Sequence, residues 1–339
     1  MITERLNIND VEYEKSVKRA ADILCNGGIV AIPTETVYGL AASANDKNAI
    51  EKVFVAKGRP QDNPLIVHIS DIDMLGEVAC DIPEEAYTCA KLFWPGPFTM
   101  ILKRSPKIAK EVSAGLDTVA VRMPSDRVAR DIIRLAGPLA APSANTSGSP
   151  SPTSAQHVID DLDGKVDAVV VSGECEVGVE STVVTLVTDP VKLLRPGAVT
   201  AEMLREVFPS ILVDRAVLQS LKADEKAASP GMKYKHYAPK TETYLVEGSI
   251  DEFCEFVNSS DDCVAVCFFE ELEKIKCPKL SYGSCADEAS LAHSLFEVLR
   301  NVDELHAQRV YIHAPSKSGI GLAVYNRLIR AAAFRVINL

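Results

Sequence analysis

A short basic turn is the first part of the sequence that could bind an anionic ligand. Lys57 and Arg59 flank a glycine and are followed by Pro60, and Pro64 stiffens the segment further. Paired cations in such a turn can hold a triphosphate, because Arg offers a fork of parallel donors and Lys a compact charge. A solvated basic turn explains the same residues without any ligand. The pattern alone therefore leaves both interpretations open.

Two further segments place polar side chains next to apolar runs. Residues 141–153 (APSANTSGSPSPT) gather short side chains that can bind phosphate or ribose without adding charge. Glu180 and Ser181 form a polar pair before a predicted strand, and Arg195 follows the next strand. The first segment is also typical of an ordinary turn-rich loop, so neither segment by itself establishes a binding site.

Single polar residues also stand at the ends of apolar strands. The segment 33–40 (PTETVYGL) follows a predicted buried strand, and α/β proteins usually bind ligands in loops at strand ends. Thr34 and Thr36 in this loop can also be caps or turn formers. His68 ends an apolar strand and can be a core histidine, and Arg122 can be a surface charge at a strand end.

The common nucleotide-binding signatures are missing from the sequence. There is no G-x-x-x-x-G-K-[ST] loop, and no G-x-G-x-x-G follows the first strand. Gly319 and Gly321 stand between a predicted strand and a helix, but Val324 takes the place of the third glycine. Too few residues follow to supply an acidic ribose ligand. We therefore expect these glycines to serve close helix–strand packing.

Hydrophobic periodicity predicts an α/β fold for the N-terminal two-thirds of the chain. Residues 11–26 have helical spacing and end at Gly27-Gly28, where a left-handed cap is expected, and residues 49–56 and 128–136 predict further helices. Short apolar runs predict buried strands at 29–32, 65–69, 98–102, 119–121, 168–171 and 182–186. The alternation indicates the α/β class and leaves the strand directions undetermined.

The C-terminal third predicts a second, smaller domain. Beyond a break in the periodicity at about 221–240, strands near 243–246, 263–268 and 309–314 alternate with helices near 250–258, 288–301 and 322–334. Such alternation is typical of a parallel, Rossmann-like sheet. We therefore expect a catalytic domain of residues 1–215, a linker of residues 216–240 and a Rossmann-like domain of residues 241–339.

Composition limits the classes of function. The 339 residues are 47% hydrophobic and 24% charged, which is typical of a folded protein too large for one ordinary core. No apolar run could span a bilayer and the first residues are polar, so we expect a cytoplasmic protein without membrane contact. Nine cysteines without a C-x-x-C pair argue against a disulfide framework or a structural zinc site. The net charge of -11 means that any contact with a polyanion must be local.

Taken together, the polar motifs resemble those of the threonylcarbamoyl-AMP synthases, the YrdC-like family. The motifs that carry the likeness are Lys57-x-Arg59, Ser143-x-Asn145, Glu180-Ser181-Thr182 and Arg195-Pro196-Gly197. Residues 229–239 (SPGMKYKHYAP) and 319–327 (GIGLAVYNR) are similar to the longer, two-domain branch of the family. The resemblance covers essentially the whole chain. It implies a YrdC-like domain with a twisted mixed sheet, followed by a smaller Rossmann-like domain with a parallel sheet.

The resemblance implies a nucleotidyltransferase reaction. In that reaction L-threonine, bicarbonate and ATP give threonylcarbamoyl-AMP and pyrophosphate, and a separate downstream transferase uses the product to make threonylcarbamoyladenosine in tRNA. Mg²⁺ is expected on the phosphates of ATP, without a dedicated protein cage. Such chemistry depends on positioning and charge neutralisation, and the sequence contains no evident Ser-His-Asp or Cys-His set.

The resemblance also implies roles for individual residues, with Lys57 and Arg59 as the expected catalytic pair. The residues expected around ATP are Lys57, Arg59, Asn63, Thr118, Ser143, Asn145, Ser151, Arg195 and Tyr237. The residues expected to hold threonine are Thr36, His68, Arg122, Ala141 and Ser181, with Arg122 paired to the substrate carboxylate. The segment from Ser229 to Lys240 is basic and aromatic. We expect it to fold over the bound nucleotide and to shield the labile adenylate from water.

Two other functions compete with this interpretation. An RNA-binding or ribosome-associated module could use a concave basic surface for double-stranded RNA, although the acidic balance of the chain weighs against it. A carbamoyl-adenylate synthase would resemble domains of hydrogenase maturation proteins, whose additional zinc-finger and acylphosphatase-like domains have no room here. Salt-sensitive RNA binding without threonine-dependent pyrophosphate release would favour the first alternative.

Overall fold

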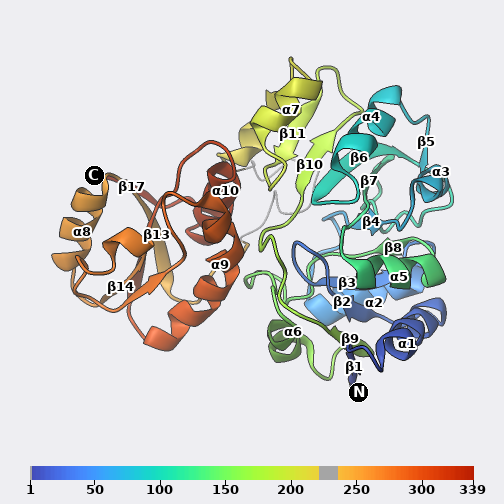
Figure 1. Ribbon diagram of the computed structural model, residues 1–339, viewed down its shortest axis with the longest axis horizontal. Helices are drawn as coiled ribbons and strands as arrows, with labels where there is room; N and C mark the ends of the chain where they lie inside the picture. The colour runs from blue at the N-terminus through green and yellow to red at the C-terminus, as the bar shows by residue number, and fades with distance from the viewer. Residues whose placement is uncertain (1, 221–235) are drawn as a thin grey trace.

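The protein contains two sheets that share no strand. The computed structural model describes residues 2–220 and 236–339, so residues 221–235 of the predicted linker lie outside the described residues. Within them, β1 to β12 form one sheet and β13 to β17 form a second, smaller sheet (Figure 1). The predicted α/β class is confirmed. No helix in the described ranges combines the length and apolar character needed to cross a bilayer.

The larger sheet is mixed, which settles the strand directions that the sequence left open. Its strands run in the spatial order β1-β9-β2-β3-β8-β4-β7-β6-β10-β11-β12, and β5 pairs with β6. Pairs such as β4–β7 and β6–β10 are parallel, whereas β2–β3 and β6–β7 are antiparallel. The strands are β1 (Glu4–Asn7), β2 (Val30–Ile32), β3 (Gly39–Ser43), β4 (Ile66–His68), β5 (Ala79–Cys80), β6 (Phe98–Arg104), β7 (Thr118–Arg122), β8 (Leu139–Ala140), β9 (Ala168–Val171), β10 (Thr182–Thr185), β11 (Lys192–Arg195) and β12 (Leu212–Val213).

Helices cover both faces of the larger sheet. In β2, Ala31 packs into the core on one face while Val30 and Ile32 pack into the core on the other, as the alternation of side chains along a strand requires. Helices α1 and α5 supply the second core, and α2, α3, α4, α6 and α7 supply the first. The helices are α1 (Tyr13–Cys25), α2 (Lys47–Lys57), α3 (Leu75–Val78), α4 (Glu84–Phe93), α5 (Arg127–Ala136), α6 (Ala155–Leu162) and α7 (Ala201–Val207).

Helix α2 packs against β3 and carries the first residue of the basic pair, Lys57, at its C-terminal end. The helix begins at the Asp46 cap, whose carboxylate accepts the backbone N–H groups of Asn48 and Ala49. It ends at Gly58, whose φ of 61° is the left-handed conformation that favours glycine at this position. The sequence suggests that Lys57 and Arg59 both lie in the turn. In the structure Lys57 is instead the last residue of the helix, and only Arg59 follows the glycine.

The smaller sheet is entirely parallel, which confirms the predicted Rossmann-like character of the C-terminal region. Its strand order is β15-β14-β16-β13-β17, and each of these pairs is parallel. The strands are β13 (Glu242–Glu247), β14 (Cys263–Cys267), β15 (Lys279–Ser281), β16 (Arg309–His313) and β17 (Val336–Asn338). Helix α8 (Ile250–Asn258) packs on one face, and α9 (Glu288–Asn301) and α10 (Gly321–Ala331) pack on the other.

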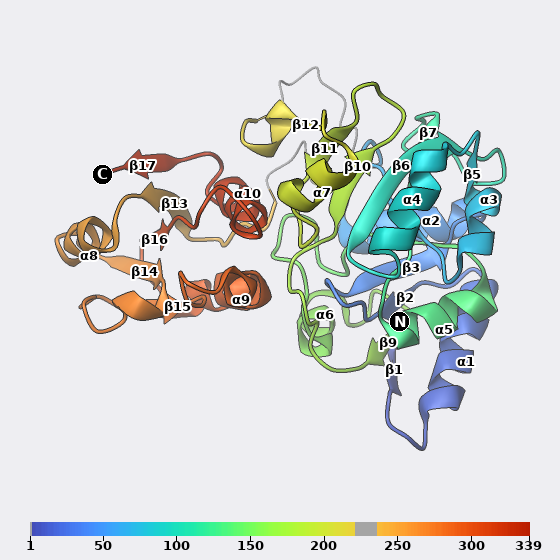
Figure 2. The same ribbon diagram turned by 45° about the horizontal axis from the view of Figure 1, so that its top comes forward.

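Helices α9 and α10 lie between the small sheet and the larger domain in both views (Figure 2). Val37 and Val179 of the larger domain belong to the same apolar cluster as Phe296 of α9 and Val324 of α10. Hydrogen bonds cross the boundary as well, since the Asn326 side chain donates to the carbonyl oxygen of Val217 at 2.6 Å. The larger domain and the C-terminal domain are therefore joined by a common apolar core and not only by a loose surface contact.

Gly319 and Gly321 at the start of α10 pack closely. They pack against Ser316 and against Glu288 of α9, and not against a strand as the sequence suggests. A Cβ atom on Gly321 would lie 2.8 Å from the carbonyl oxygen of Ser316 and 2.8 Å from the Glu288 carboxylate. The Glu288 carboxylate accepts the Gly321 N–H at 2.9 Å. A carboxylate of the protein itself thus occupies the position at this helix N-terminus where an anionic ligand could bind.

Candidate active site

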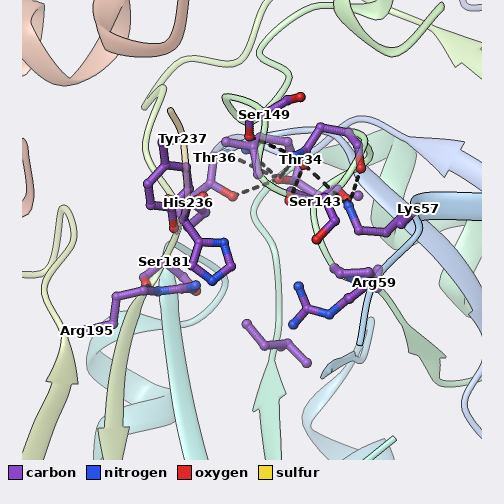
Figure 3. A pocket seen from close by; sticks show the side chains of 18 of the residues that line it. Thr34, Thr36, Lys57, Arg59, Ser143, Ser149, Ser181, Arg195, His236 and Tyr237 are labelled. Atoms are coloured by element: carbon purple, nitrogen blue, oxygen red, sulfur yellow. Dashed lines mark hydrogen bonds between the residues drawn. The ribbon is translucent and has the colours of Figure 1, made fainter. Parts of the chain in front are cut away.

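One cavity in the larger domain brings together polar residues from eight separate segments (Figure 3). About 720 Å³ of space around these residues is free of protein atoms, and this volume includes open solvent. The predicted residues that line it are Thr36, Lys57, Arg59, His68, Arg122, Ala141, Ser143, Asn145, Ser181, Arg195 and Tyr237. The basic turn, the hydroxyl-rich loop and the strand-end residues therefore form one site.

Lys57 joins α2 to the hydroxyl-rich loop. Its ammonium group donates to the backbone carbonyl oxygens of Ser143 and Asn145, and it lies 3.4 Å from the side-chain oxygen of Asn145. Burial, reinforced by the nearby charge of Arg59, lowers the pKa of Lys57 well below its usual range. Lys57 therefore fixes the position of this loop in addition to lining the cavity.

Arg59 forms the edge of the cavity nearest the basic turn, and Asn63 lies beside Arg59. The Arg59 guanidinium points into the cavity (Figure 3) and lies 3.4 and 3.3 Å from the carbonyl oxygens of Asn63 and Pro64. The Asn63 side chain is 1% exposed. Within the described residues, neither its nitrogen nor its oxygen has a hydrogen-bond partner. Buried amides are normally paired, so this one is suited to a bound ligand.

The hydroxyl-rich loop is held against the start of β3. The backbone of Leu40 donates to Pro142 and that of Ala144 donates to Tyr38, both at 2.8 Å. The Asn145 side chain donates to the carbonyl oxygens of Thr146 and Ser149 at 2.8 and 2.9 Å. These bonds leave the Ser143 hydroxyl facing the cavity beside Asn145. The loop is thus a rigid wall of small polar groups.

Arg122 and His68 close the inner end of the cavity. Arg122 is 4% exposed, which rules out a surface charge. It pairs with Glu35 at 2.8 Å and donates to the Thr36 hydroxyl at 2.8 Å. Burial, followed by the Arg122 charge, lowers the pKa of His68 to about 3, so this imidazole is neutral. Thr34 is a turn former, because its hydroxyl donates to the Val37 carbonyl oxygen at 2.7 Å.

Ser181 and Arg195 form the opposite wall. Arg195 donates to the Ser181 carbonyl oxygen at 2.9 Å and lies 3.1 Å from the Ser181 hydroxyl. That hydroxyl is also 2.7 Å from the hydroxyl of Thr99 on β6. Burial lowers the pKa of Arg195 to about 10, although the Glu180 carboxylate opposes this shift. Arg195 therefore remains a cation near neutral pH.

The end of the linker also reaches the cavity. His236 and Tyr237 both line it (Figure 3). The Tyr237 ring lies 5.1 Å from that of Phe296 on α9, and the Ala238 backbone donates to Gly148 at 3.0 Å. Burial lowers the pKa of His236 to about 3. The predicted cover over a bound nucleotide falls mainly on residues outside the described ranges and stays a prediction.

Three predicted ATP-binding residues are not among those that line the cavity. Asn63 lies beside Arg59, and the Ser151 hydroxyl donates to the Glu180 carboxylate at 2.6 Å. Thr118 begins β7, whose other end carries Arg122 to the cavity. Sequence reasoning assigned no ligand-binding role to Thr34, Glu180 or His236, which do line the cavity. Each stands within two residues of a predicted site residue, and that adjacency was the available signal.

Gly197 is required where the turn after Arg195 packs against the turn formed by residues 180–182. A Cβ atom at this position would lie 2.5 Å from the Thr182 backbone nitrogen and 2.9 Å from the Glu180 carbonyl oxygen. We expect Gly197→Ala to push the Arg195 turn away from Ser181 and to cost about 1–3 kcal/mol of unfolding free energy. Chemical denaturation measures the loss. Gly76→Ala is the control, because a Cβ atom there meets nothing within 4 Å; equal losses in the two variants would contradict this account.

The fold and the cavity define a class of two-domain α/β protein with a cationic pocket in its larger domain. Residues 22–197 match the Sua5–YciO–YrdC family model, described as "Telomere recombination". Residues 199–333 match the model described as "Threonylcarbamoyl-AMP synthase, C-terminal domain". The chain belongs to the threonylcarbamoyl-AMP synthase family, and it has the two-domain form.

Individual relatives agree over nearly the whole chain. A Pyrococcus abyssi protein named threonylcarbamoyl-AMP synthase is 43% identical, with 98% of this chain and 98% of that protein covered. A Bacillus subtilis protein of the same name is 42% identical, with 99% and 97% covered. The crystal structure of P. abyssi Sua5 complexed with L-threonine superposes with a TM-score of 0.91 at 38% identity, and it covers 100% of both chains.

Proposed function

We propose that this chain is an L-threonylcarbamoyladenylate synthase, a nucleotidyltransferase that converts L-threonine, bicarbonate and ATP into threonylcarbamoyl-AMP and pyrophosphate. The observation that supports this most directly is the convergence of Arg59, Ser143, Ser181 and Arg195 on one cavity. The cavity is suited to a triphosphate beside a small amino acid. The product would pass to a separate transferase that makes threonylcarbamoyladenosine in tRNA, and the nine free thiols are suited to the reducing cytosol.

The reaction has two chemical stages. The free amine of threonine captures CO₂ or bicarbonate to give a carbamate, with loss of water when bicarbonate is used. A carbamate oxygen then attacks the α-phosphorus of ATP in line, and pyrophosphate leaves from the opposite side. The cavity residues supply cations, hydroxyls and backbone amides rather than a nucleophile, as phosphoryl-type transfer requires.

The ATP site lies toward the basic turn. Arg59 would hold the triphosphate with its fork of donors, and Lys57 would add positive charge while it fixes the loop that carries Ser143 and Asn145. Arg195 and Tyr237 would contact the nucleotide from the opposite wall. The unpaired Asn63 amide would complete its hydrogen bonds on the nucleotide, and Ser151 would act through Glu180. Thr118, at the end of β7 opposite Arg122, would act only indirectly, through that strand.

The threonine site lies at the inner end. Arg122 would pair with the substrate carboxylate, since its ion pair with Glu35 and its bond to Thr36 leave N–H groups on a guanidinium that carries five. Neutral His68 would face the amino acid without repelling its amine, and Ser181 with the backbone of Ala141 would complete the pocket.

Mg²⁺ would bind as a complex with the nucleotide rather than in a preformed protein site. The carboxylates near the cavity are already paired, because Glu180 contacts Arg327 and Glu35 contacts Arg122. Within the described residues, no cluster of potential metal ligands is present. Phosphate oxygens and water are the ligands that Mg²⁺ commonly keeps in such sites.

The test is an assay of pyrophosphate release from ATP in the presence of bicarbonate. Three reactions are compared, containing threonine, serine or no amino acid. We expect release with threonine only, because the inner pocket must be filled for the carbamate to lie close to the α-phosphorus. Equal release in all three reactions would indicate an ATP pyrophosphohydrolase, and absence of release together with salt-sensitive RNA binding would favour an RNA-binding module.

A further inference from the structure

An arginine of the C-terminal domain reaches the wall of the cavity in the larger domain. Arg327 lies in α10 and is 0% exposed. Its Nε donates to the Glu180 carboxylate at 2.9 Å, and its Nη2 donates to the Glu180 carbonyl oxygen at 3.0 Å. Its Nη1 donates to the Pro196 carbonyl oxygen at 2.6 Å. One guanidinium therefore binds two separate turns of the larger domain.

Those two turns carry the residues of the second cavity wall. Glu180 directly precedes Ser181, and Pro196 directly follows Arg195. The Arg195 guanidinium and the Ser181 hydroxyl are themselves only 3.1 Å apart. Because Arg327 fixes the backbone on both sides of this pair, it determines how far the two groups extend into the cavity.

The ion pair between Arg327 and Glu180 also neutralises the negative charge of that wall. The Glu180 carboxylate lines a cavity suited to a polyanion, where an uncompensated negative charge would oppose binding. Burial alone would raise the pKa of Glu180. The charges of Arg327 and Arg195 and the Ser151 hydroxyl outweigh burial and lower that pKa to about 2, so the group is an anion that needs a cation beside it.

We propose that Arg327 is a positioning residue of the active site, contributed by the C-terminal domain, which holds the Ser181 and Arg195 turns in place and neutralises Glu180. This inference rests on the proposed function and gives the C-terminal domain a direct role in it. Arg327 is too deeply buried behind Glu180 and Pro196 to serve as a ligand of the substrates. It acts through these two residues.

The test compares Arg327→Met, Arg327→Lys and the double variant Glu180→Gln/Arg327→Met in the full chain. We expect Arg327→Met to lower kcat/KM for ATP by about 100-fold, mainly through KM, because displacement of positioning groups by about 1 Å has effects of this order. Arg327→Lys should recover part of the loss, since it keeps the charge but cannot reach all three acceptors. The kcat/KM of the double variant for ATP should exceed that of Arg327→Met by at least about fivefold, because no unpaired buried charge then remains.

Arg335→Met is the matched control. Arg335 belongs to the same domain and pairs with Glu242 at 2.9 Å, away from the cavity. Its kinetic constants should stay within about twofold of the wild type. Thermal unfolding and isothermal titration with ATP accompany the kinetics, so that an unfolded Arg327→Met variant leaves the decision to the lysine variant.

The outcomes separate the two proposals. A wild-type protein without threonine-dependent pyrophosphate release overturns the proposed function. An active wild type with an unchanged KM for ATP in the folded Arg327→Met variant overturns the role of Arg327. A folded double variant no better than folded Arg327→Met also overturns it, because removal of the orphaned Glu180 charge should restore ATP binding if Arg327 acts by neutralising that charge. When Arg327→Met does not fold, an unchanged KM for ATP in the folded lysine variant overturns it.

Discussion

Replacement of Arg59 by alanine is expected to lower threonine-dependent pyrophosphate release by about 100-fold or more. The guanidinium points into the cavity beside the unpaired Asn63 amide, and in the proposed ATP site it would stabilise the charge that develops on the departing pyrophosphate. Removal of one preorganised donor in such a site typically costs on the order of 10²–10³ in rate. Steady-state assays at saturating and limiting ATP measure the change in kcat and in KM.

Arg205→Ala is the control for the loss of one positive charge. Arg205 lies on α7, its side chain is 51% exposed, and it pairs only loosely with Glu202 at 3.7 Å. We expect its activity to match that of the wild type. If Arg59→Ala retained more than about a third of wild-type activity, Arg59 would be a solvated residue at the rim and the ATP site would have to lie elsewhere.

Lys57→Met should reduce both stability and activity. The substitution keeps the length of the buried side chain and removes its hydrogen bonds to the carbonyl oxygens of Ser143 and Asn145. Each unsatisfied buried acceptor costs about 1–3 kcal/mol, so the free energy of unfolding should fall by about 2–5 kcal/mol. Activity should fall by about 100-fold, because the loop that bears Ser143 loses its anchor. Denaturant titration and the pyrophosphate assay measure the two effects.

Lys52→Met provides the comparison for Lys57. Lys52 lies on the same helix and also donates to a backbone carbonyl, that of Gly27 at 2.7 Å, but this contact is exposed to solvent. Its replacement should change the unfolding free energy by less than about 0.5 kcal/mol. If the two lysine variants were equally stable, the contacts of Lys57 with the loop would have no energetic importance.

The sequence predicted the elements better than it predicted how they meet. The helices expected at 11–26, 49–56 and 128–136 agree with α1, α2 and α5 to within two residues at each end, because their apolar spacing reflects the face that packs on the sheet. The directions of the strands were not predictable. They depend on pairings between segments far apart in the chain, such as β6 with β10.

The same limit explains the outcome at the site. Thr118 and Arg122 occupy opposite ends of β7, and only the direction of β4 and β7 decides which end faces the cavity. Arg327 could not be found from periodicity, because a charged residue on an amphipathic helix is ordinarily expected to face solvent. Its partner Glu180 is 147 residues away in sequence.

The apolar cluster shared by Val37, Val179, Tyr237 and helices α9 and α10 couples the unfolding of the two domains, although their sheets are separate. Separation of the sheets would expose this core to water, so the halves should melt in one cooperative step rather than as independent blocks. Because Val37 and Tyr237 also border the cavity, a nucleotide bound there would make the distant small sheet more resistant to heat. Binding of a ligand in the pocket would therefore raise the melting temperature of both domains together.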